Sequence, residues 1–283
     1  SEIYDLLCRR GFSAQVALQV EVYDFELPRR MTCTAAFGFS PDEVFRYQAL
    51  ADPQQQRAVL AACAPALQRL REGFGKEFMS PPVRSFDTPL PYLADFRELG
   101  RVLLGEAALA AREGRFGDAA NSYLDMVRLA HDLPRGATLI HALVGVAIEA
   151  MALAPLSKLV PKLDEHAAMS AVQRLRALHE TAVRWDEVLA EESQASRHAV
   201  LQQDDAMKEV QQQAGAAGPG GQVVLQRSLP HIEQFYKAAI EEARKPFHAR
   251  QAVPIPDDPL AKTLLPMLGK ATLGQAVAET RRA

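Results

Sequence analysis

Residues 98–160 read ELGRVLLGEAALAAREGRFGDAANSYLDMVRLAHDLPRGATLIHALVGVAIEAMALAPLSKLV, and this stretch decides the fold. Small and apolar residues recur through its first half at the spacing of a helix face. They are Leu103, Ala107 and Ala110, followed by Ala119, Tyr123, Met126 and Ala130. Between the two groups, GRFG at 114–117 is a glycine-marked break, and Asp118 then places a carboxylate where a helix start favours one. The sequence therefore predicts two antiparallel helices joined by a short loop.

A third helix is predicted to begin after Thr138, which can cap it, and to include the run TLIHALVGVAIEAMALAPL at 138–156. His141 and Glu149 are the only ionisable residues in this run. The run is nearly long enough to cross a bilayer, but these two groups and Pro155 argue against a membrane span. The pattern favours the central core helix of a soluble domain.

The first two helices resemble a tetratricopeptide repeat, in which small residues let two helices approach, a glycine sits at the turn and an aromatic wedges between them. The residues at matching offsets are Ala107, Ala110, Gly114, Phe116, Ala119 and Tyr123, with Leu103 in the usual tryptophan position. Pro134 comes late for that motif, and no second copy follows at the repeat period of about 34 residues. The alternative is an ordinary helical hairpin with small residues at its contact.

The N-terminal part departs from the helical pattern. Apolar residues alternate from Val16 to Leu27 and a β-prone run follows from Met31 to Phe39, which together predict a small β-hairpin leaning on the helices. The sequence suggests four parts: an N-terminal segment, a helical core domain, a flexible loop, and C-terminal helices that pack on the core. Their expected boundaries are 1–47, 48–210, 211–222 and 223–283.

Helical spacing continues on both sides of the central stretch. From Asp164, which can cap a helix, the run stays helix-like to about Gln213, or about 75 Å at 1.5 Å per residue. One straight helix of that length does not fit a compact domain, so we expect a break between Ala177 and Trp185 or an arm that projects outward. The predicted fold class is mainly all-α, as an irregular helical-hairpin bundle or a short solenoid.

Composition and net charge limit the kinds of partner that we expect for this chain. With 283 residues the chain can bury a sizeable core, as one elongated domain or two small ones. A net charge of −3 and a pI near 6.2 leave no basic footprint, so we do not expect nucleic acid as a partner. Cys8, Cys33 and Cys63 form no metal-ligand pattern; they are three buried thiols, or one disulfide and one thiol. From Ser1 onward we expect no signal peptide or membrane span, so any membrane contact would use a segment outside this chain.

Four stretches carry a second resemblance. They are FRELGRVLLGEAALAAREGRF, TLIHALVGVAIEAMAL, HIEQFYKAAIEEARKPF and PLAKTLLPMLGKA. Together they resemble uncharacterised cell-envelope helical proteins of planctomycete-type bacteria, in which a membrane anchor precedes the helical part and a pilin-like segment often follows it. The first 45 residues here depart from that pattern. The resemblance implies the extracytoplasmic side of the cell envelope, with the cytoplasm as the alternative, and it implies no catalytic residue.

Recognised catalytic and metal-binding motifs are absent from the sequence. None of the seven histidines falls in an HExxH pattern, and no Glu-x-x-His occurs twice as a di-metal bundle requires. A phosphate-binding loop, a dinucleotide fingerprint and a G-x-S-x-G elbow are also missing. We therefore expect no bound metal and no cofactor.

His141 and Glu149 remain the sharpest candidates for a polar site. They are eight residues apart and so lie about 80° apart around the predicted helix, on one broad face. Each needs a partner if it is buried, and the preceding helix offers Asp125 and Arg128. Two interpretations stay open: a satisfied polar pair in a helical core, or a polar spot in a groove that recognises a ligand.

Two functional classes follow. The first is a non-enzymatic helical interaction or scaffold module of the cell envelope, whose helices present a face to a protein partner. The residues we expect on that face are Arg101, Arg112, Tyr123 and Arg128. The second is an envelope hydrolase or metal-dependent enzyme with its site around His141 and Glu149. Because the sequence contains no recognisable nucleophile–base pair, it favours the interaction module.

Overall fold

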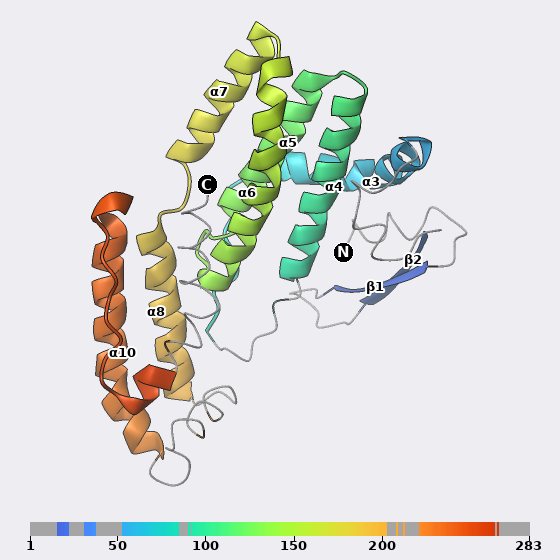
Figure 1. The fold of residues 1–283 in the computed structure, drawn as a ribbon. Coiled ribbons are helices and arrows are strands. Elements are labelled where there is room, and N and C mark those ends of the chain that lie inside the picture. The colour runs from blue at the N-terminus through green and yellow to red at the C-terminus, as the bar shows by residue number, and fades with distance from the viewer. Residues whose placement is uncertain are drawn as a thin grey trace. The chain divides into compact units, whose positions relative to one another are not determined.

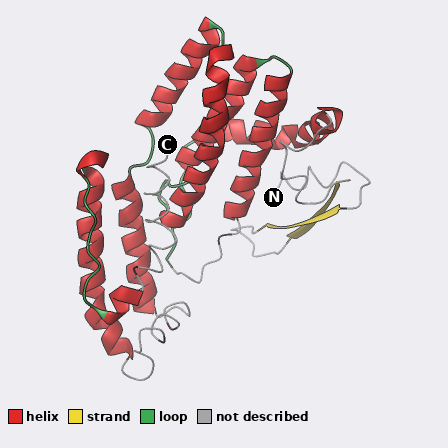
Figure 2. Ribbon diagram, viewed as in Figure 1, coloured by secondary structure: helices red, strands yellow, loops and turns green. Residues whose placement is uncertain are grey.

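A computed structural model shows a chain built mainly of α-helices, which confirms the predicted all-α class (Figures 1 and 2). It describes residues 53–84, 90, 92–202, 208, 212, 221–263 and 265, and it describes the backbone alone at 16–22, at 31–37 and at some helix positions. The predicted flexible loop at 211–222 and the end of the predicted C-terminal helical part at 223–283 lie almost wholly outside these residues.

The chain divides into two compact units, each assembled from separated segments. Unit 1 contains Ser1–Phe78, Leu90–His131 and Ala147–Ala182. Unit 2 contains Met79–Pro89, Asp132–Val146 and Val183–Ala283. This division differs from the predicted one, in which 48–210 is a single core domain. One boundary between the units falls between Val146 and Ala147, inside a continuous helix, and the amino-acid composition does not change there.

Unit 1 is a bundle of helices whose contacts are made by small and apolar side chains. Its described helices are α3 (Pro53–Gly73), α4 (Tyr92–Arg112), α5 (Phe116–Asp132), the second part of α6 (Leu139–Leu159), the short η2 (Val160–Lys162) and α7 (Glu165–Glu180). Side chains of α3 and α4 share one cluster, formed by Val59, Leu60, Cys63 and Leu109. The Gln56 amide adds a hydrogen bond of 3.1 Å to the carbonyl of Gly105, so α3 is fixed to α4 by both apolar and polar contacts.

Helices α4 and α5 form the predicted hairpin, and they lie side by side in Figure 1. The turn between them contains Gly114 at a φ of 78°, a conformation that glycine adopts without strain. The small residues expected at the helix contact, Ala107, Ala110 and Ala119, are all at most 1% exposed. The predicted spacing therefore gave the correct packing face of both helices.

Helix α7 begins at the predicted cap, because the Asp164 carboxylate accepts a hydrogen bond of 2.8 Å from the Ala167 backbone N–H. It ends at Glu180, and α8 (Trp185–Gln202) begins five residues later. The predicted break between Ala177 and Trp185 is thus confirmed. Near the start of α7, a Cβ added at Gly117 would lie 3.5 Å from the Ala167 side chain, so α5 and α7 meet closely there.

Helix α6 is apolar all round but is covered on one face. With η2 it spans Leu139–Lys162, 24 residues with a mean hydropathy of 1.9 in their most apolar window. By length and composition alone it could cross a membrane, and the core helix of a soluble protein passes the same test. Ile148 and Ala152 are fully buried, whereas Ala150 and Leu153 are exposed. The predicted central core helix therefore has one packed face and one open face.

Unit 2 combines the first part of α6 with α8, α10 (Gly221–Arg244) and the short η3 (Phe247–Ala249). One apolar cluster joins α8 and α10 to residues near 260, with Ile232, Tyr236 and Leu260 at most 2% exposed. A second cluster joins the start of α6 to α8 and α10, and Trp185 packs against it. The single tryptophan is thus part of a helix contact.

In the part of the chain that the structure describes, two strands come before α3. Strand β1 (Val16–Val22) pairs antiparallel with β2 (Met31–Phe37), so that Val16 lies opposite Phe37 and Val22 opposite Met31. The side chains of Cys8 and Cys33 lie outside the described residues, and Cys63 carries a buried thiol.

Candidate functional site

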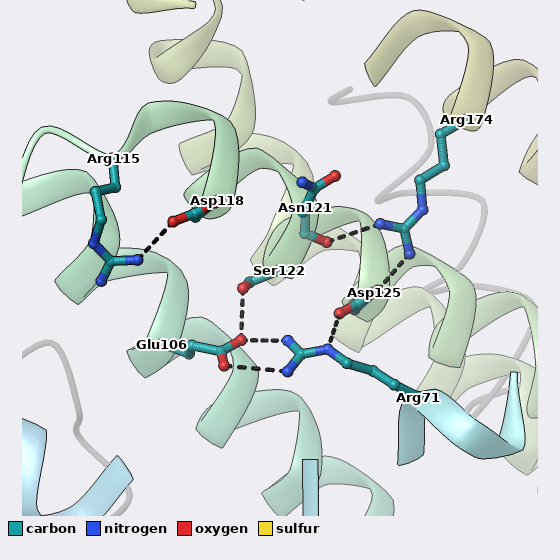
Figure 3. A network of polar contacts seen from close by, with 8 residues as sticks. All are labelled: Arg71, Glu106, Arg115, Asp118, Asn121, Ser122, Asp125 and Arg174. Carbon is teal, nitrogen blue, oxygen red and sulfur yellow. Dashed lines mark hydrogen bonds and ion pairs between the residues drawn. The ribbon is translucent and has the colours of Figure 1, made fainter. Parts of the chain in front are cut away.

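A polar pocket of about 550 Å³ lies among four helices of unit 1 and forms the candidate site (Figure 3). Helices α3, α4, α5 and α7 and the turn between α4 and α5 line it. We call it the charged pocket, because arginine and carboxylate side chains dominate its wall. Its lining residues are Arg71, Arg115 and Arg174; Glu106, Asp118 and Asp125; Asn121 and Ser122; and Leu60, Leu109 and Ala110.

Arg71, from the last turn of α3, lies at the centre of the pocket's ion pairs. Its two terminal nitrogens donate to both oxygens of Glu106 on α4, and its Nε donates to Asp125 Oδ2 on α5 at 2.7 Å. Burial opposes the charge of this guanidinium, but the hydrogen bonds to Glu106 and Asp125 outweigh it and raise the pKa of Arg71. Arg71 is therefore a permanent cation that links three helices.

Asp125 is 5% exposed and joins α5 to α7 as well. Arg174 of α7 donates to Asp125 Oδ1, and it also donates to the backbone carbonyl of Asn121 at 3.2 Å. Each oxygen of Asp125 thus accepts from a different arginine, one on α3 and one on α7. In Figure 3 the two guanidinium groups approach this carboxylate from opposite sides.

Two further groups complete the wall. The Ser122 hydroxyl donates to Glu106 Oε2 at 2.6 Å, so this carboxylate is shared by Arg71 and Ser122. At the rim, Arg115 donates to Asp118 Oδ2 at 2.7 Å and to Glu113 Oε2. The rim is more open than the centre: the side chains of Arg115 and Asp118 are 51% and 62% exposed.

The pocket keeps hydrogen-bonding capacity for a ligand. Arg174 uses two of its five N–H groups within the described residues, which leaves donors for another acceptor. Asn121 is an exposed residue that lines the pocket, and its side-chain amide has no hydrogen bond in the described part of the chain. Leu60, Leu109 and Ala110 supply an apolar wall beside these groups. Such an arrangement can hold a ligand that combines a carboxylate, a peptide-like amide and a small apolar group.

The residues predicted for a binding face lie elsewhere, and none of the four lines the charged pocket. Arg101 is half-buried and pairs with Glu98, Arg112 donates to Gln56 Oε1 at 3.2 Å, and Arg128 is half-buried. Tyr123 is 4% exposed, which places its ring in the helix contact and not on a surface that a partner could reach.

The ion pairs of the charged pocket were not predicted from the sequence, although one residue indicated that such a pair exists. Asp125 stands among Tyr123, Leu124, Met126 and Val127, all of which belong to the buried part of α5. A carboxylate in such a run needs a cationic partner. The partners come from α3 and α7, about 50 residues away on either side, so the sequence does not show which arginines they are.

The structure gives His141 and Glu149 different partners. His141 is 0% exposed, and its Nδ1 lies 3.2 Å from the Thr138 hydroxyl in unit 2. Glu149 Oε1 is 3.1 Å from Nε2 of His131 in unit 1. The other ring nitrogen of His131 lies 3.2 Å from the carbonyl of Leu178. His131 thus connects the end of α5 to both α6 and α7.

Burial lowers the pKa of His141 to about 4, against a weaker opposing effect of a hydrogen bond to the backbone of Thr138. Between pH 6.5 and about 4 the unfolded chain binds a proton at His141, whereas the folded chain does not. The contribution of His141 to the free energy of unfolding is therefore present above this window and is lost as pH falls through it. We expect His141 to reduce the free energy of unfolding by about 2–3 kcal/mol across that window. Urea titrations of wild type and His141→Gln at several pH values measure this contribution, which should vanish in the variant.

An exposed histidine provides the control. His166→Gln makes the same substitution at an exposed position of α7, and the loss of stability on acidification that His141 causes should remain in this variant. The explanation would be wrong if His141→Gln retained the same loss of stability on acidification as the wild type.

A second buried carboxylate lies in unit 2. Glu192 of α8 is 4% exposed, and its Oε2 accepts a hydrogen bond of 2.9 Å from the Leu139 backbone N–H at the first turn of α6. Burial raises the pKa of Glu192, and the N–H donor partly offsets this effect. Nearby, the hydroxyls of Ser196 and Tyr236 are 3.0 Å apart, and burial together with the charge of Glu192 raises the pKa of Tyr236. This polar cluster positions the start of α6.

The described residues contain no group of three or more His, Cys, Asp or Glu side chains arranged to hold a metal ion. Comparison of the chain with protein-family models, curated proteins and solved structures finds no match.

Proposed function

We propose that the chain is a non-enzymatic helical interaction module, and that its charged pocket binds an extended segment of a protein partner. The observation that carries this proposal is the pocket itself: a space of about 550 Å³ with a fixed guanidinium wall and an unengaged amide. Ion pairs between four helices hold the guanidinium groups of its wall, so these groups are ordered before a partner arrives. Such preorganisation reduces the entropy lost on binding.

The partner segment should carry a carboxylate. Arg174 and Arg115 both keep N–H groups beyond those used in their ion pairs, and planar guanidinium groups bind carboxylates through paired hydrogen bonds. The acids of the pocket are already engaged by Arg71, Arg115 and Arg174, so they repel an incoming carboxylate less than unpaired acids would.

Two further groups suit a peptide. The Asn121 amide offers one acceptor and two donors, which match the N–H and C=O of an extended backbone. Leu60, Leu109 and Ala110 can cover a small aliphatic side chain of the partner. The lining residues include no histidine, cysteine, lysine or tyrosine, so a base suited to activating the Ser122 hydroxyl would have to be Glu106, which Arg71 already engages.

A displayed library of random peptides tests this proposal. Selection on the wild type should enrich peptides with an Asp or Glu, and the affinity of the consensus peptide can be measured by calorimetry. Asn121→Ala should weaken that affinity about tenfold, because a peptide group then loses its paired hydrogen bonds. The matched control is Gln173→Ala, which removes an exposed amide from α7 that does not line the pocket.

Melting curves of both variants check that the fold is intact. The proposal would be abandoned if no peptide were enriched over a surface without protein, or if the consensus peptide bound Asn121→Ala as tightly as the wild type.

We also propose the cell envelope as the location, on the strength of the four stretches that resemble planctomycete-type envelope proteins. Fractionation of cells that express the full-length gene, followed by detection with an antibody against this chain, tests it. Recovery in the cytoplasmic fraction would favour the alternative.

A further inference from the structure

Helix α7 has two different faces. Its inner face carries Ala167, Arg174 and Leu178, which contact α5, the charged pocket and His131. On the other side, Glu165, Met169, Val172 and Arg176 follow one another at spacings of four, three and four residues. At 3.6 residues per turn these four fall within about 60° around the helix. We call them the α7 seam.

The seam is open in the structure. Met169 is 55% and Val172 43% exposed, and Glu165 and Arg176 are exposed as well. Neither charged residue has an ion pair within the described chain. Leu175, 38% exposed, widens the apolar centre on one side. A stripe with this 4-3 spacing is the pattern by which one helix packs along another.

We propose that the α7 seam binds the α7 seam of a second copy of this chain, with the two helices antiparallel. A two-fold axis between Met169 and Val172 places Met169 opposite Val172 of the other copy, and Glu165 opposite its Arg176. The contact then has four layers: two apolar layers at the centre and an opposite-charge pair at each end. Both copies use the same residues, as a closed symmetric dimer requires.

Charge complementarity selects this partner and this orientation. The seam is acidic at its N-terminal end and basic at its C-terminal end, so it is complementary to itself only when the second helix is reversed. A parallel pair would place Glu165 against Glu165 and Arg176 against Arg176, and like charges in such positions are destabilising. The antiparallel arrangement satisfies all four positions at once.

The size of the seam sets the strength of the contact. Its four layers extend over about 17 Å of helix, at 1.5 Å per residue. One helix pair of this length buries less than the roughly 1,200 Å² typical of stable complexes, so the dimer is a weak one in rapid exchange. It should be favoured wherever the chain is concentrated.

Variants that exchange the charges of Glu165 and Arg176 test the proposed dimer. Their dissociation constants can be measured by sedimentation velocity of the full chain over a range of concentrations. The wild type should show a reversible monomer–dimer equilibrium. Glu165→Arg and Arg176→Glu each create a like-charge layer at both ends of the dimer, and each should raise the dissociation constant about tenfold. The double variant Glu165→Arg/Arg176→Glu restores opposite charges, and it should return the constant to within about threefold of the wild type.

Ser170→Arg is the control, because it adds a positive charge to an exposed position of α7 that lies off the seam. It should leave dimerisation unchanged, and circular dichroism should show intact helices in every variant. The proposal would be overturned if the wild type stayed monomeric at all concentrations. It would also be overturned if the single variants dimerised as tightly as the wild type, or if the double variant dimerised as weakly as the single variants.

Discussion

Replacing Asp125 by alanine should lower the free energy of unfolding by about 3 kcal/mol, because this buried carboxylate holds two arginines at once. In the wild type Asp125 accepts from Arg71 on α3 and from Arg174 on α7. After the substitution both guanidinium groups keep one other partner, Glu106 and the Asn121 carbonyl, and both are partly exposed. The loss should therefore fall at the lower end of what removing one partner of a buried ion pair produces.

Urea denaturation followed by far-ultraviolet circular dichroism measures this change. Asp118→Ala is the matched control, since it removes an aspartate from the same helix and the same pocket, but from an exposed pair with Arg115. We expect it to change stability by less than about 1 kcal/mol. If Asp125→Ala were no more harmful than Asp118→Ala, the ion pairs would not be what holds α3, α5 and α7 together.

The second large effect is expected at Glu192. Glu192→Ala removes the acceptor of the Leu139 N–H at the buried start of α6, and we expect a loss of about 2 kcal/mol. Glu192→Gln keeps an oxygen that can accept this bond, and its side chain has nearly the same volume. At neutral pH it should therefore be at least as stable as the wild type.

The two variants also differ from the wild type in pH dependence. Because the pKa of Glu192 is raised in the folded state, the folded chain holds a proton that the unfolded chain has already released. The stability from this group is fully present below the unfolded pKa, about 4.3, and is lost as pH rises through the folded value. Glu192→Gln does not titrate, so it should lack this loss. A Glu192→Gln variant that weakened with rising pH as much as the wild type would contradict the assignment.

Glu192 and His141 act in opposite directions on acidification. His141 makes the chain less stable as pH falls below 6.5, whereas Glu192 makes it more stable as pH falls through its own folded value. The wild-type profile is the sum of both, and each glutamine variant should expose the contribution of the other residue.

Local patterns in the sequence were enough to predict much of the helical framework. The turn at Gly114, the cap at Asp164 and the break after Glu180 each depend on a few neighbouring residues. Apolar spacing likewise identified the packed face of α4 and α5, because a helix buries residues that recur along one side. These features are encoded within one or two turns of helix.

The charged pocket could not be predicted in the same way. Its centre depends on Arg71, Asp125 and Arg174, which come together only after three helices have packed. The acceptor of the Leu139 N–H could not be predicted either, because Glu192 lies 53 residues further along the chain. Arginine and glutamate are common on helix surfaces, and nothing in their local sequence distinguishes these residues from solvated ones. The α7 seam, by contrast, follows from spacing alone, but only the structure shows that it faces outward.

The interleaved segments of the two units determine how the chain can be made and divided. A ribosome delivers Leu139 and Ala142 well before Val188 and Leu189, the residues that share their apolar cluster. The start of α6 therefore has to wait for α8 during synthesis, while the rest of α6 can already pack with α4 and α5. The same order means that no single cut yields two complete halves. A fragment ending at Ala182 would contain the apolar start of α6 without α8 and α10, against which it packs. The remaining fragment would contain α8 and α10 without the start of α6.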